Sequence, residues 1–441
     1  NQVVAGAGTG KTFALIYRVA YLVQTGVDAS RIVALTYTTE AATEMETRLE
    51  TEFGITNVEV RTIHAFAYQI AQETGDRTRS VAQSRDKYNL IKNVLEKEEG
   101  SDSEFAEHYV RFLYHYDDDF LDEADFHEKT DYVAERRDRT YETLGGEEVA
   151  SEAEKVIADF LFTHNITYRY EAIAEWAATA EGQPYRPDFY LPDYDIYIEH
   201  WGLDENGEVA PWFSQSSDEY FEKLRWVREE FQRGESELIG TYEFEHESGR
   251  LERALEHRLE AAGVDLGRMS FDEFVDDVFE YNEKRGDIED SFKQFVENAK
   301  TFDVAPDEIP DRLDRSKPRQ YHFGHCGREM LEQYDAYLQR NELLDFDDMI
   351  YDAIEAIEVD PASFQDRYDH ILVDEFQDVA MSQIRLVRPF VGPDAGTRLF
   401  CVGDDWQSIY SFQGSQVEYF VNFGDHFGPP APVVTRLTAN Y

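Results

Sequence analysis

A glycine-rich loop lies almost at the start of the chain and constrains what the residues around it can form. Residues 5–12 read Ala-Gly-Ala-Gly-Thr-Gly-Lys-Thr, after the apolar pair Val3 and Val4 and before an amphipathic stretch over residues 13–23. A strand, a glycine-rich loop and a helix in this order are typical of a phosphate-binding loop, whose backbone N–H groups surround phosphate oxygens. Lys11 is then expected to reach the β- and γ-phosphates of a nucleotide and Thr12 to hold Mg²⁺.

The loop departs from the usual pattern at its first position, where Ala5 replaces glycine. The alternative interpretation is a chance glycine-rich turn before a helix. The expected nucleotide-binding residues are Ala5, Gly6, Ala7, Gly8, Thr9, Gly10, Lys11 and Thr12.

Two adjacent carboxylates follow a second apolar run, far along the chain. Residues 370–378 read His-Ile-Leu-Val-Asp-Glu-Phe-Gln-Asp, which predicts a buried parallel strand with acids at its carboxyl end. Open α/β sheets bind their ligands at that edge. Asp374 is expected to bind the Mg²⁺ of the nucleotide, and Glu375 to orient and deprotonate the attacking water. A solvated acidic turn is the alternative in so acidic a chain.

The charge of the chain indicates where it works. Its 441 residues carry 42 Lys and Arg against 92 Asp and Glu, a formal net charge of −50. Such a charge repels itself at low salt, but at molar salt the Debye length is only about 3 Å. A hydrophobic content of 42% excludes a disordered acidic protein. We therefore expect adaptation to a salt-rich cytoplasm, with DNA contacts made by stacking, backbone amides and a few arginines.

Cysteine usage and hydropathy point to the same compartment. Cys326 and Cys401 lie far apart and outside any metal-binding spacing, so buried thiols in a reducing compartment are expected. No apolar run is long enough for a membrane span. The chain begins almost inside the first strand and without Met, which suggests a chain trimmed at its start.

The pattern along the chain divides it into five segments. Residues 1–78 and 345–441 alternate strands and helices, so together they are expected to form one α/β domain with a parallel sheet. Residues 79–150 and 247–344 are expected to be helical insertions. Residues 151–246 follow the order α-β-β-β-α-β, with a helix expected over 152–163 and a strand over 194–199, and are expected to form a compact unit of their own.

Three further segments complete a family pattern. Leu-Thr-Tyr-Thr-Thr-Glu begins at residue 35, Thr-Ile-His-Ala-Phe at residue 62 and Gly-Asp-Asp-Trp-Gln-Ser-Ile-Tyr at residue 403. With the loop and the acids, these segments resemble the superfamily 1 DNA helicases of the UvrD/Rep group, and the last of them looks most like the helicase IV branch. The resemblance covers residues 1–78 and about 330–441. It implies a RecA-like P-loop domain, ATP with Mg²⁺, and 3′→5′ movement on single-stranded or partly duplex DNA in replication or repair.

The resemblance also assigns roles to single residues. Lys11, Glu375 and Gln407 are the implied catalytic residues, with Gln407 sensing the γ-phosphate. The implied DNA contacts are Tyr37, Thr38, His64, Tyr410 and Phe412. Core packing remains the alternative for each aromatic residue, and a structural role remains open for His64.

The chain departs from the family pattern in three places. Gln413 stands where the family usually has Arg, and Glu40 where it usually has Lys. Residues 436–441 resemble the start of the family's fourth motif, but the chain stops before the expected Arg. We therefore expect a missing second RecA-like domain with its arginine fingers, and weak ATP hydrolysis by the isolated chain.

The segment 151–246 carries a second possible activity. Asp188 and Glu199 are expected on neighbouring strands, where with Glu154 from the preceding helix they can share a metal ion that activates water. This resembles the core of the PD-(D/E)xK (restriction-endonuclease-like) nucleases. Trp201 stands where that family usually has Lys, and Lys223 on a later helix is the candidate replacement.

Three functions thus remain open from the sequence. The first is an ATP-driven DNA translocase. The second is a metal-dependent endonuclease that an ATP-binding, DNA-gripping domain delivers to its substrate. The third is a non-catalytic DNA-binding module left by a truncated gene. For the nuclease-like segment alone, the alternative is a fold retained as a DNA-binding or structural insertion without cleavage.

Overall fold

The computed structural model describes residues 1–441 except 6–9, 75–78, 119–125, 127, 179–182, 210–215, 280, 392–395, 405–421, 428–431 and 438–441. It divides into two compact units. The first contains residues 1–91, 291–305 and 331–441, and the second contains residues 92–290 and 306–330.

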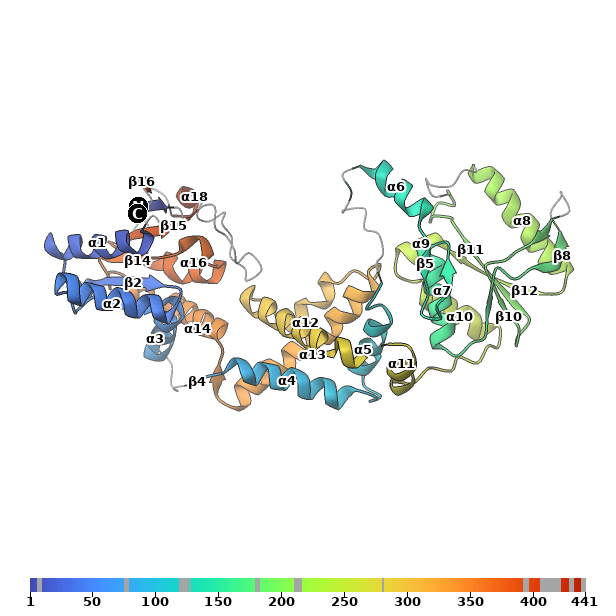
Figure 1. The fold of residues 1–441 in the computed structure, drawn as a ribbon, viewed down its shortest axis with the longest axis horizontal. Helices are drawn as coiled ribbons and strands as arrows, with labels where there is room; N and C mark the ends of the chain where they lie inside the picture. Colours follow the sequence, from blue (N-terminus) through green and yellow to red (C-terminus); the bar gives the residue numbers. More distant parts are fainter. Residues whose placement is uncertain are drawn as a thin grey trace. The chain divides into compact units, whose positions relative to one another are not determined.

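A six-stranded parallel sheet forms the centre of the first unit (Figure 1). Its strands are β1 (Gln2–Ala5), β2 (Ile32–Thr36), β3 (Glu59–Thr62), β14 (His370–Val373), β15 (Arg398–Gly403) and β16 (Val434–Leu437). They lie in the order β16-β1-β15-β14-β2-β3, and each neighbouring pair is parallel. Strands from both ends of the sequence lie side by side, which confirms the predicted parallel sheet shared by the two ends.

Successive strand residues enter two hydrophobic cores, one on each face of this sheet. Ile32 and Ala34 of β2 belong to the core that also contains α1 (Lys11–Gln24) and α2 (Thr39–Phe53). Val33 and Leu35 belong to the core formed with α3 (Ile63–Thr74), α14 (Phe346–Val359) and α16 (Met381–Val387). Because helices cover both faces, the strands are apolar along their whole length rather than alternating. Cys401 is buried in the second core, and both cysteines are free and buried as predicted.

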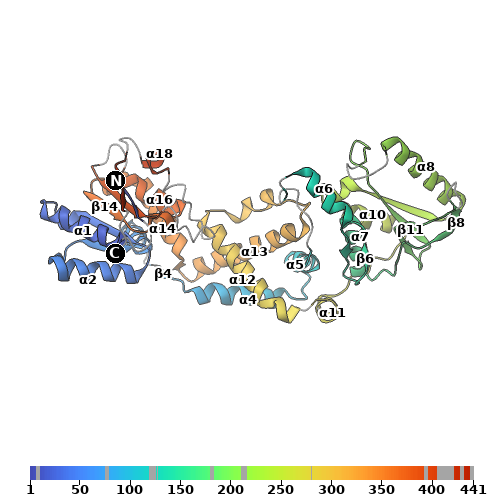
Figure 2. The same ribbon diagram turned by 45° about the horizontal axis from the view of Figure 1, so that its top comes forward.

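The second unit is built around a four-stranded sheet (Figure 2). Its strands are β7 (Arg169–Tyr170), β10 (Phe189–Leu191), β11 (Ile196–Trp201) and β12 (Glu237–Tyr242), in the order β12-β11-β10-β7. β11 and β12 are parallel, whereas β10 is antiparallel to both of its neighbours. The predicted strand over 194–199 begins two residues later than expected and runs on to Trp201, because that ring packs into the core rather than leaving the sheet.

The two faces of this sheet pack against different helices. Ile196 and Ile198 of β11 lie in the core that contains α7 (Glu152–Thr163) and α10 (Leu251–Ala261). Tyr197 and Trp201 lie in the core that contains α8 (Ser217–Arg233). Since side chains alternate along a strand, Glu199 shares the α8 face with Tyr197 and Trp201. α7 has the bounds predicted from the sequence, and α8 begins after the N-cap Ser216.

The other elements lie outside these two sheets. Three long helices have residues in both units: α4 (Ser84–Glu98), α12 (Tyr281–Thr301) and α13 (Pro318–Arg340). The remaining helices and strands are α5 (Glu104–Tyr114), α6 (Lys129–Asp138), α9 (Glu243–Glu247), α11 (Phe271–Asp277), α15 (Pro361–Phe364), α18 (Phe423–Phe427), β4 (Ser80–Val81), β5 (Tyr141–Glu142), β6 (Glu148–Val149), β8 (Ala174–Ala178), β9 (Pro184–Tyr185) and β13 (Leu343–Leu344). Short 3₁₀ helices occur at η1 (Ala29–Arg31), η3 (Pro306–Glu308), η4 (Pro310–Arg312), η5 (Phe376–Asp378) and η6 (Arg388–Val391). Within the described residues, no helix is both long and apolar enough to cross a membrane.

Gly249 allows the turn before α10 to approach another backbone segment closely. It has a φ of 63°, and a Cβ at this position would overlap the backbone carbonyl of Arg315. Gly263, at the other end of α10, has a φ of 81° but no heavy atom within 4 Å of such a Cβ. The two glycines therefore share a backbone conformation and differ in the space around them.

We expect Gly249→Ala to destabilise the protein by more than Gly263→Ala. The left-handed backbone costs an alanine about 1–2 kcal/mol at either position, and only Gly249→Ala adds the collision with Arg315. Unfolding of the two variants by denaturant, followed by circular dichroism, measures the difference. Equal losses of stability would show that the turn and the Arg315 segment are not in contact.

Candidate active site

The start of α1, which follows the glycine-rich loop, has no side-chain cap from its N-cap residue. Gly10 has a left-handed conformation (φ 80°, ψ 42°) and precedes α1 without a side-chain cap on the first amides. Ala5 is buried at the end of β1, and Gly6, Ala7, Gly8 and Thr9 lie outside the described residues. An uncapped helix start with its positive dipole end is suited to an anion.

Lys11 and Glu375 form an ion pair across the edge of the sheet. The Lys11 Nζ lies 2.6 Å from Glu375 Oε2, and the two side chains are 10% and 35% exposed. Glu375 lies two residues after the end of β14 and has a left-handed backbone with a φ of 49°. Its carboxylate meets the first residue of α1, so two of the three predicted catalytic residues come together.

Thr12 and Asp374 meet beside this pair, one residue after Lys11 and one residue before Glu375. The Thr12 hydroxyl donates a hydrogen bond of 2.9 Å to Asp374 Oδ2. Asp374 is buried, and burial together with the neighbouring Glu375 raises the pKa of its carboxyl. A hydroxyl and a carboxylate are hard oxygen ligands of the kind that Mg²⁺ prefers. Within the described residues, no three His, Cys, Asp or Glu side chains are arranged to hold a metal ion by themselves.

Gln377 is a residue of this site that the sequence analysis missed. Its Nε2 donates to Glu375 Oε2 at 2.9 Å and to Asp378 Oδ2 at 2.8 Å. Its Oε1 accepts a hydrogen bond of 2.9 Å from the amide of Asp404, which follows β15. The buried amide therefore links the ends of β14 and β15. Gln377 lies inside the acidic run 374–378, and the prediction from the sequence rested on the carboxylates of that run alone.

A groove of about 550 Å³ beside this site collects the predicted DNA contacts of the first unit. Tyr37 follows β2 and is half-buried, Thr38 is exposed, and His64 lies in the first turn of α3. The Thr38 hydroxyl also accepts a hydrogen bond of 3.2 Å from Ala41 N and caps α2. Gln407, Tyr410, Phe412 and Gln413 lie outside the described residues.

Phe346 is a second residue that the sequence analysis did not find. Its ring lies in the same groove, 5.2 Å from the His64 ring in an edge-on arrangement, and is 53% exposed. An exposed aromatic ring in a groove is a stacking surface. No spacing in the sequence distinguishes this phenylalanine from the many in the cores.

The groove is acidic despite its aromatic walls. Lys87 is the lysine in its lining, which also contains the carboxylates of Glu40, Glu297, Asp345, Asp347 and Asp378. Burial and the neighbouring Asp345 raise the pKa of Asp347 to about 7. A nucleic-acid strand here would be gripped by ring faces and hydroxyls rather than by a field of cations.

A second cluster unites four predicted residues in the second unit. Asp188 precedes β10, Glu199 lies on β11, Glu154 on α7 and Lys223 on α8. Burial, and then the charges of Glu199 and Glu154, raise the pKa of Asp188 well above its ordinary value. Asp188 is therefore close enough to both of the other carboxylates to be repelled by their charges.

Asp188 and Glu199 each accept a hydrogen bond from a neighbouring residue. Asp188 Oδ2 accepts a hydrogen bond of 2.5 Å from the His200 amide. Glu199 accepts one from the Tyr185 hydroxyl, and its Oε1 lies 3.5 Å from Lys223 Nζ. Within the described residues, no hydrogen bond is found at the buried Glu199 Oε2.

Trp201 stands where the nuclease family that this segment resembles usually has lysine. The indole is fully buried in the α8 core, and the Lys223 ammonium lies 5.8 Å from its ring centroid. A lysine at position 201 would have to be buried in that apolar core.

The pH dependence of stability reports on the burial of His64. Burial lowers the pKa of His64 from 6.5 to about 4, so the unfolded chain binds the proton more strongly than the folded protein. The burial of the neutral ring therefore costs no stability above about pH 6.5, and the free energy of unfolding decreases as the pH falls from 6.5 toward 4. We expect wild-type stability to fall more steeply between pH 6.5 and 5 than that of His64→Gln, by at most about 1.4 kcal/mol per pH unit.

Denaturant unfolding of both proteins at constant salt measures this difference. Asp347 acts with the opposite sign, because its raised pKa makes stability fall as the pH rises toward 7. Both proteins keep Asp347, so its contribution cancels in the comparison. Parallel stability curves for wild type and His64→Gln would show that His64 is not desolvated.

Comparison with known proteins gives a consistent family. The model of the UvrD/REP helicase N-terminal domain matches residues 1–177 and 218–428. DNA helicase IV of Escherichia coli is 36% identical over 99 residues, which are 22% of this chain and 14% of that protein. ATP-dependent DNA helicase Rep of E. coli is 38% identical over 122 residues, which are 27% of this chain and 17% of that protein.

A third relative is also a helicase by name, and each alignment covers only part of either protein. The putative ATP-dependent DNA helicase YjcD of Bacillus subtilis is 35% identical over 115 residues, which are 25% of this chain and 15% of that protein. The alignments thus span less than a fifth of each of these relatives. The family model leaves out residues 178–217, which contain Asp188 and Glu199, but it covers every strand of the six-stranded sheet except β16. Since the match includes most of the chain and the whole Lys11–Glu375 site, this chain belongs to the UvrD/REP helicase family.

Proposed function

We propose that this chain supplies the ATP-binding and DNA-gripping part of a superfamily 1 DNA helicase that moves 3′→5′ on single-stranded or partly duplex DNA. The observation that carries the proposal is the double contact at the sheet edge, where Lys11 meets Glu375 and Thr12 meets Asp374. The relatives named above are helicases, and two are named ATP-dependent.

The residues of the site divide the work on a bound nucleotide. ATP with Mg²⁺ supplies the phosphoanhydride bond that is hydrolysed and the charge that polarises it. Thr12 and Asp374 provide two oxygen ligands for the cation, and a magnesium site of this kind takes its other ligands from phosphates and water. Lys11 exchanges its contact with Glu375 for a phosphate, which frees the Glu375 carboxylate to orient and deprotonate water. Gln377 holds that carboxylate in position through its amide.

The groove beside the site supplies the grip on DNA in this proposal. Tyr37 and Phe346 offer ring faces for bases, and Thr38 offers a hydroxyl to the backbone. His64 is neutral at pH 7 because its pKa is about 4, so it would act as a hydrogen-bonding ring rather than as a cation. The net charge of −50 supports a further inference that the protein works in a salt-rich cytoplasm.

Lys11→Ala tests nucleotide binding. Removing the ammonium takes away the cation for the β- and γ-phosphates, so affinity for a fluorescent ATP analogue with Mg²⁺ should fall at least about tenfold. Lys92→Ala is the matched control, because Lys92 forms an exposed pair with Glu96 in the second unit. Equal affinities of Lys11→Ala and wild type would overturn the proposed nucleotide site.

A second candidate function is metal-dependent DNA cleavage by the Asp188–Glu199 cluster. The specific observation in its favour is the convergence of three carboxylates and Lys223, with no hydrogen bond found at the buried Glu199 Oε2 within the described part of the chain. Asp188 and Glu199 would hold the metal ion with ligands from water and DNA, and Lys223 would stabilise the charge that develops on the phosphate.

Asp188→Asn tests this second function with little change of shape. If the cluster is a nuclease site, cleavage of supercoiled or single-stranded DNA with Mn²⁺ or Mg²⁺ should fall at least about a hundredfold, since a metal ligand is lost. Asp193→Asn, in the exposed turn between β10 and β11, is the control. Lys11→Ala should leave cleavage unchanged. No cleavage by wild type, or unchanged cleavage by Asp188→Asn, would reject the nuclease.

A further inference from the structure

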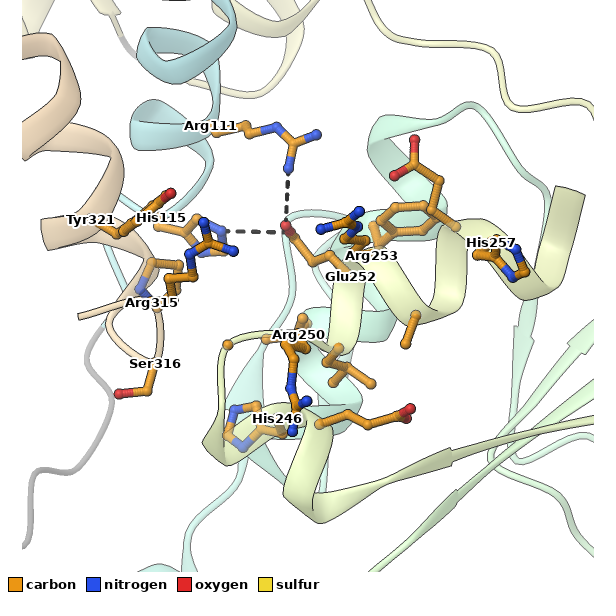
Figure 3. A pocket seen from close by; sticks show the side chains of 18 of the residues that line it. Arg111, His115, His246, Arg250, Glu252, Arg253, His257, Arg315, Ser316 and Tyr321 are labelled. Atoms are coloured by element: carbon orange, nitrogen blue, oxygen red, sulfur yellow. Dashed lines mark hydrogen bonds and ion pairs between the residues drawn. The ribbon is translucent and has the colours of Figure 1, made fainter. Parts of the chain in front are cut away.

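The second unit contains a cavity whose charge is opposite to that of the chain (Figure 3). The cavity has a volume of about 700 Å³ and is lined by five arginines, four of the chain's 12 histidines, three glutamates and no aspartate or lysine. We call it the arginine pocket and define it by Arg111, Arg250, Arg253, Arg258 and Arg315. The cavity beside it, on the other side of Arg111, carries five carboxylates against two arginines.

Each glutamate of the pocket already has a cationic partner. Glu252 lies 3.3 Å from Arg111 Nη1 and 3.7 Å from His115 Nε2 (Figure 3). Arg258 donates two hydrogen bonds, of 2.8 and 2.5 Å, to Glu245. Glu256 lies 3.7 Å from Arg268, which stands outside the pocket lining. Of the other three arginines, Arg250 pairs with Glu205 outside the lining, with 3.0 Å between Nη2 and Oε1. The glutamates of the lining therefore occupy neither Arg253 nor Arg315.

His115 adds a further positive charge to the lining of the pocket. Burial alone lowers the pKa of His115, but its hydrogen bond to Asp118 and its contact with Glu252 raise it to about 10. His115 is thus a cation at pH 7, and the charge of Glu252 is shared between two cations. Within the described residues, neither Arg253 nor Arg315 has a carboxylate partner, and both are exposed.

The start of α10 contributes a second source of positive potential. Leu251, Glu252 and Arg253 form the first turn of this helix and line the pocket, and Arg250 at the N-cap makes no side-chain cap. The amides of a first helical turn have no intrahelical acceptor and carry the positive end of the dipole. Uncommitted guanidinium groups and a helix start therefore face the same cavity.

The arginines of the pocket favour a phosphate as the bound anion. All five of its permanent cations are arginines, whose planar guanidinium binds two oxygens of a phosphate at once. The Tyr321 ring lies beside Arg315, with 5.5 Å between the guanidinium carbon and the ring centroid, and it offers a face for a base. The rest of this acidic chain repels a polyanion, so contact is favoured where the arginines gather.

We propose that the arginine pocket binds a backbone phosphate of a nucleic-acid strand. This inference rests on the proposed DNA-binding function and adds a contact point in the second unit. Because the contact is a direct, bidentate one inside a cavity, it survives the short Debye length of a salt-rich solution better than a diffuse surface charge would.

Binding of a labelled single-stranded oligonucleotide to the full chain tests the pocket. The double variant Arg253→Ala/Arg315→Ala should weaken binding at least tenfold, and the slope of log affinity against log salt should fall by about 1 to 2. Arg169→Ala/Arg225→Ala is the matched control. It removes two exposed arginines of the same unit that also lack carboxylate partners in the described chain. The control should bind within about twofold of wild type.

A cross-link locates the strand independently of affinity. Both native cysteines are buried, so Ser316→Cys places one accessible thiol in the pocket lining. An oligonucleotide with a thiol-reactive group on one phosphate should cross-link to Ser316→Cys and not to Ser363→Cys in the first unit. If AMP or inorganic phosphate suppresses the cross-link and an unmodified oligonucleotide does not, the pocket serves a free phosphate ligand and the proposal is wrong.

The outcomes separate this inference from the proposed function. If wild type binds DNA, Tyr37→Ala weakens that binding and the double arginine variant behaves like its control, the pocket inference fails and the proposed function stands. If wild type binds no DNA, both fail. Circular dichroism of each variant confirms that its fold is retained.

Discussion

The register of one parallel sheet makes the candidate active site possible. Lys11 and Glu375 are 364 positions apart in sequence, and Thr12 and Asp374 are 362 apart. They meet because β1 and β14 run in the same direction on either side of β15, which pairs with both. The carboxyl ends of parallel strands share one edge, so the two segments arrive together whatever lies between them in sequence. A slip of one residue would turn Asp374 away from Thr12 and every core side chain of β14 to the other face.

That constraint explains where the chain tolerates additions. The segment between β3 and β14 leaves the first unit and returns, and it includes the whole second unit. The points where this segment leaves and rejoins the first unit need only preserve the two hydrophobic cores that flank the sheet. Those cores fix α1, α3 and α14 against the strands. Gln377 adds a polar tie across β14 and β15 on the same edge. The site is therefore held by the sheet and its own hydrogen bonds, and the second unit has its own sheet and its own cores.

The parts of this structure that sequence could predict are those that depend on short patterns. The helix after the glycine-rich loop, the apolar strand before Asp374 and the helix over 152–163 are each specified by a short stretch of sequence, and the structure contains all three. Residues 6–9 of the loop itself lie outside the described residues. Gln377 and Phe346 escaped because their roles depend on neighbours from other elements. The arginine pocket escaped more completely, because Arg111, Arg253 and Arg315 come from three separate segments and no spacing relates them. The carboxylate cluster lay between these cases. Asp188, Glu199 and Glu154 were expected to share a site from their predicted places on neighbouring strands and the preceding helix, whereas the burial of Trp201 depends on packing against α8.

The two sites proposed to contact nucleic acid have opposite electrostatics. A chain at −50 lowers the concentration of any polyanion near its surface, and salt relieves this only by screening. In the proposed function, the ring faces and the neutral His64 of the acidic groove would contact bases without relying on charge. In the second unit, Arg253 and Arg315 are kept free of carboxylates while Arg111, His115 and Arg258 neutralise the glutamates around them. Stacking is nearly independent of salt, and a bidentate contact inside a cavity is less sensitive to it than surface charge. An acidic protein can therefore hold DNA in concentrated salt by contacts that do not depend on the long-range field, which a conventional basic surface would lose.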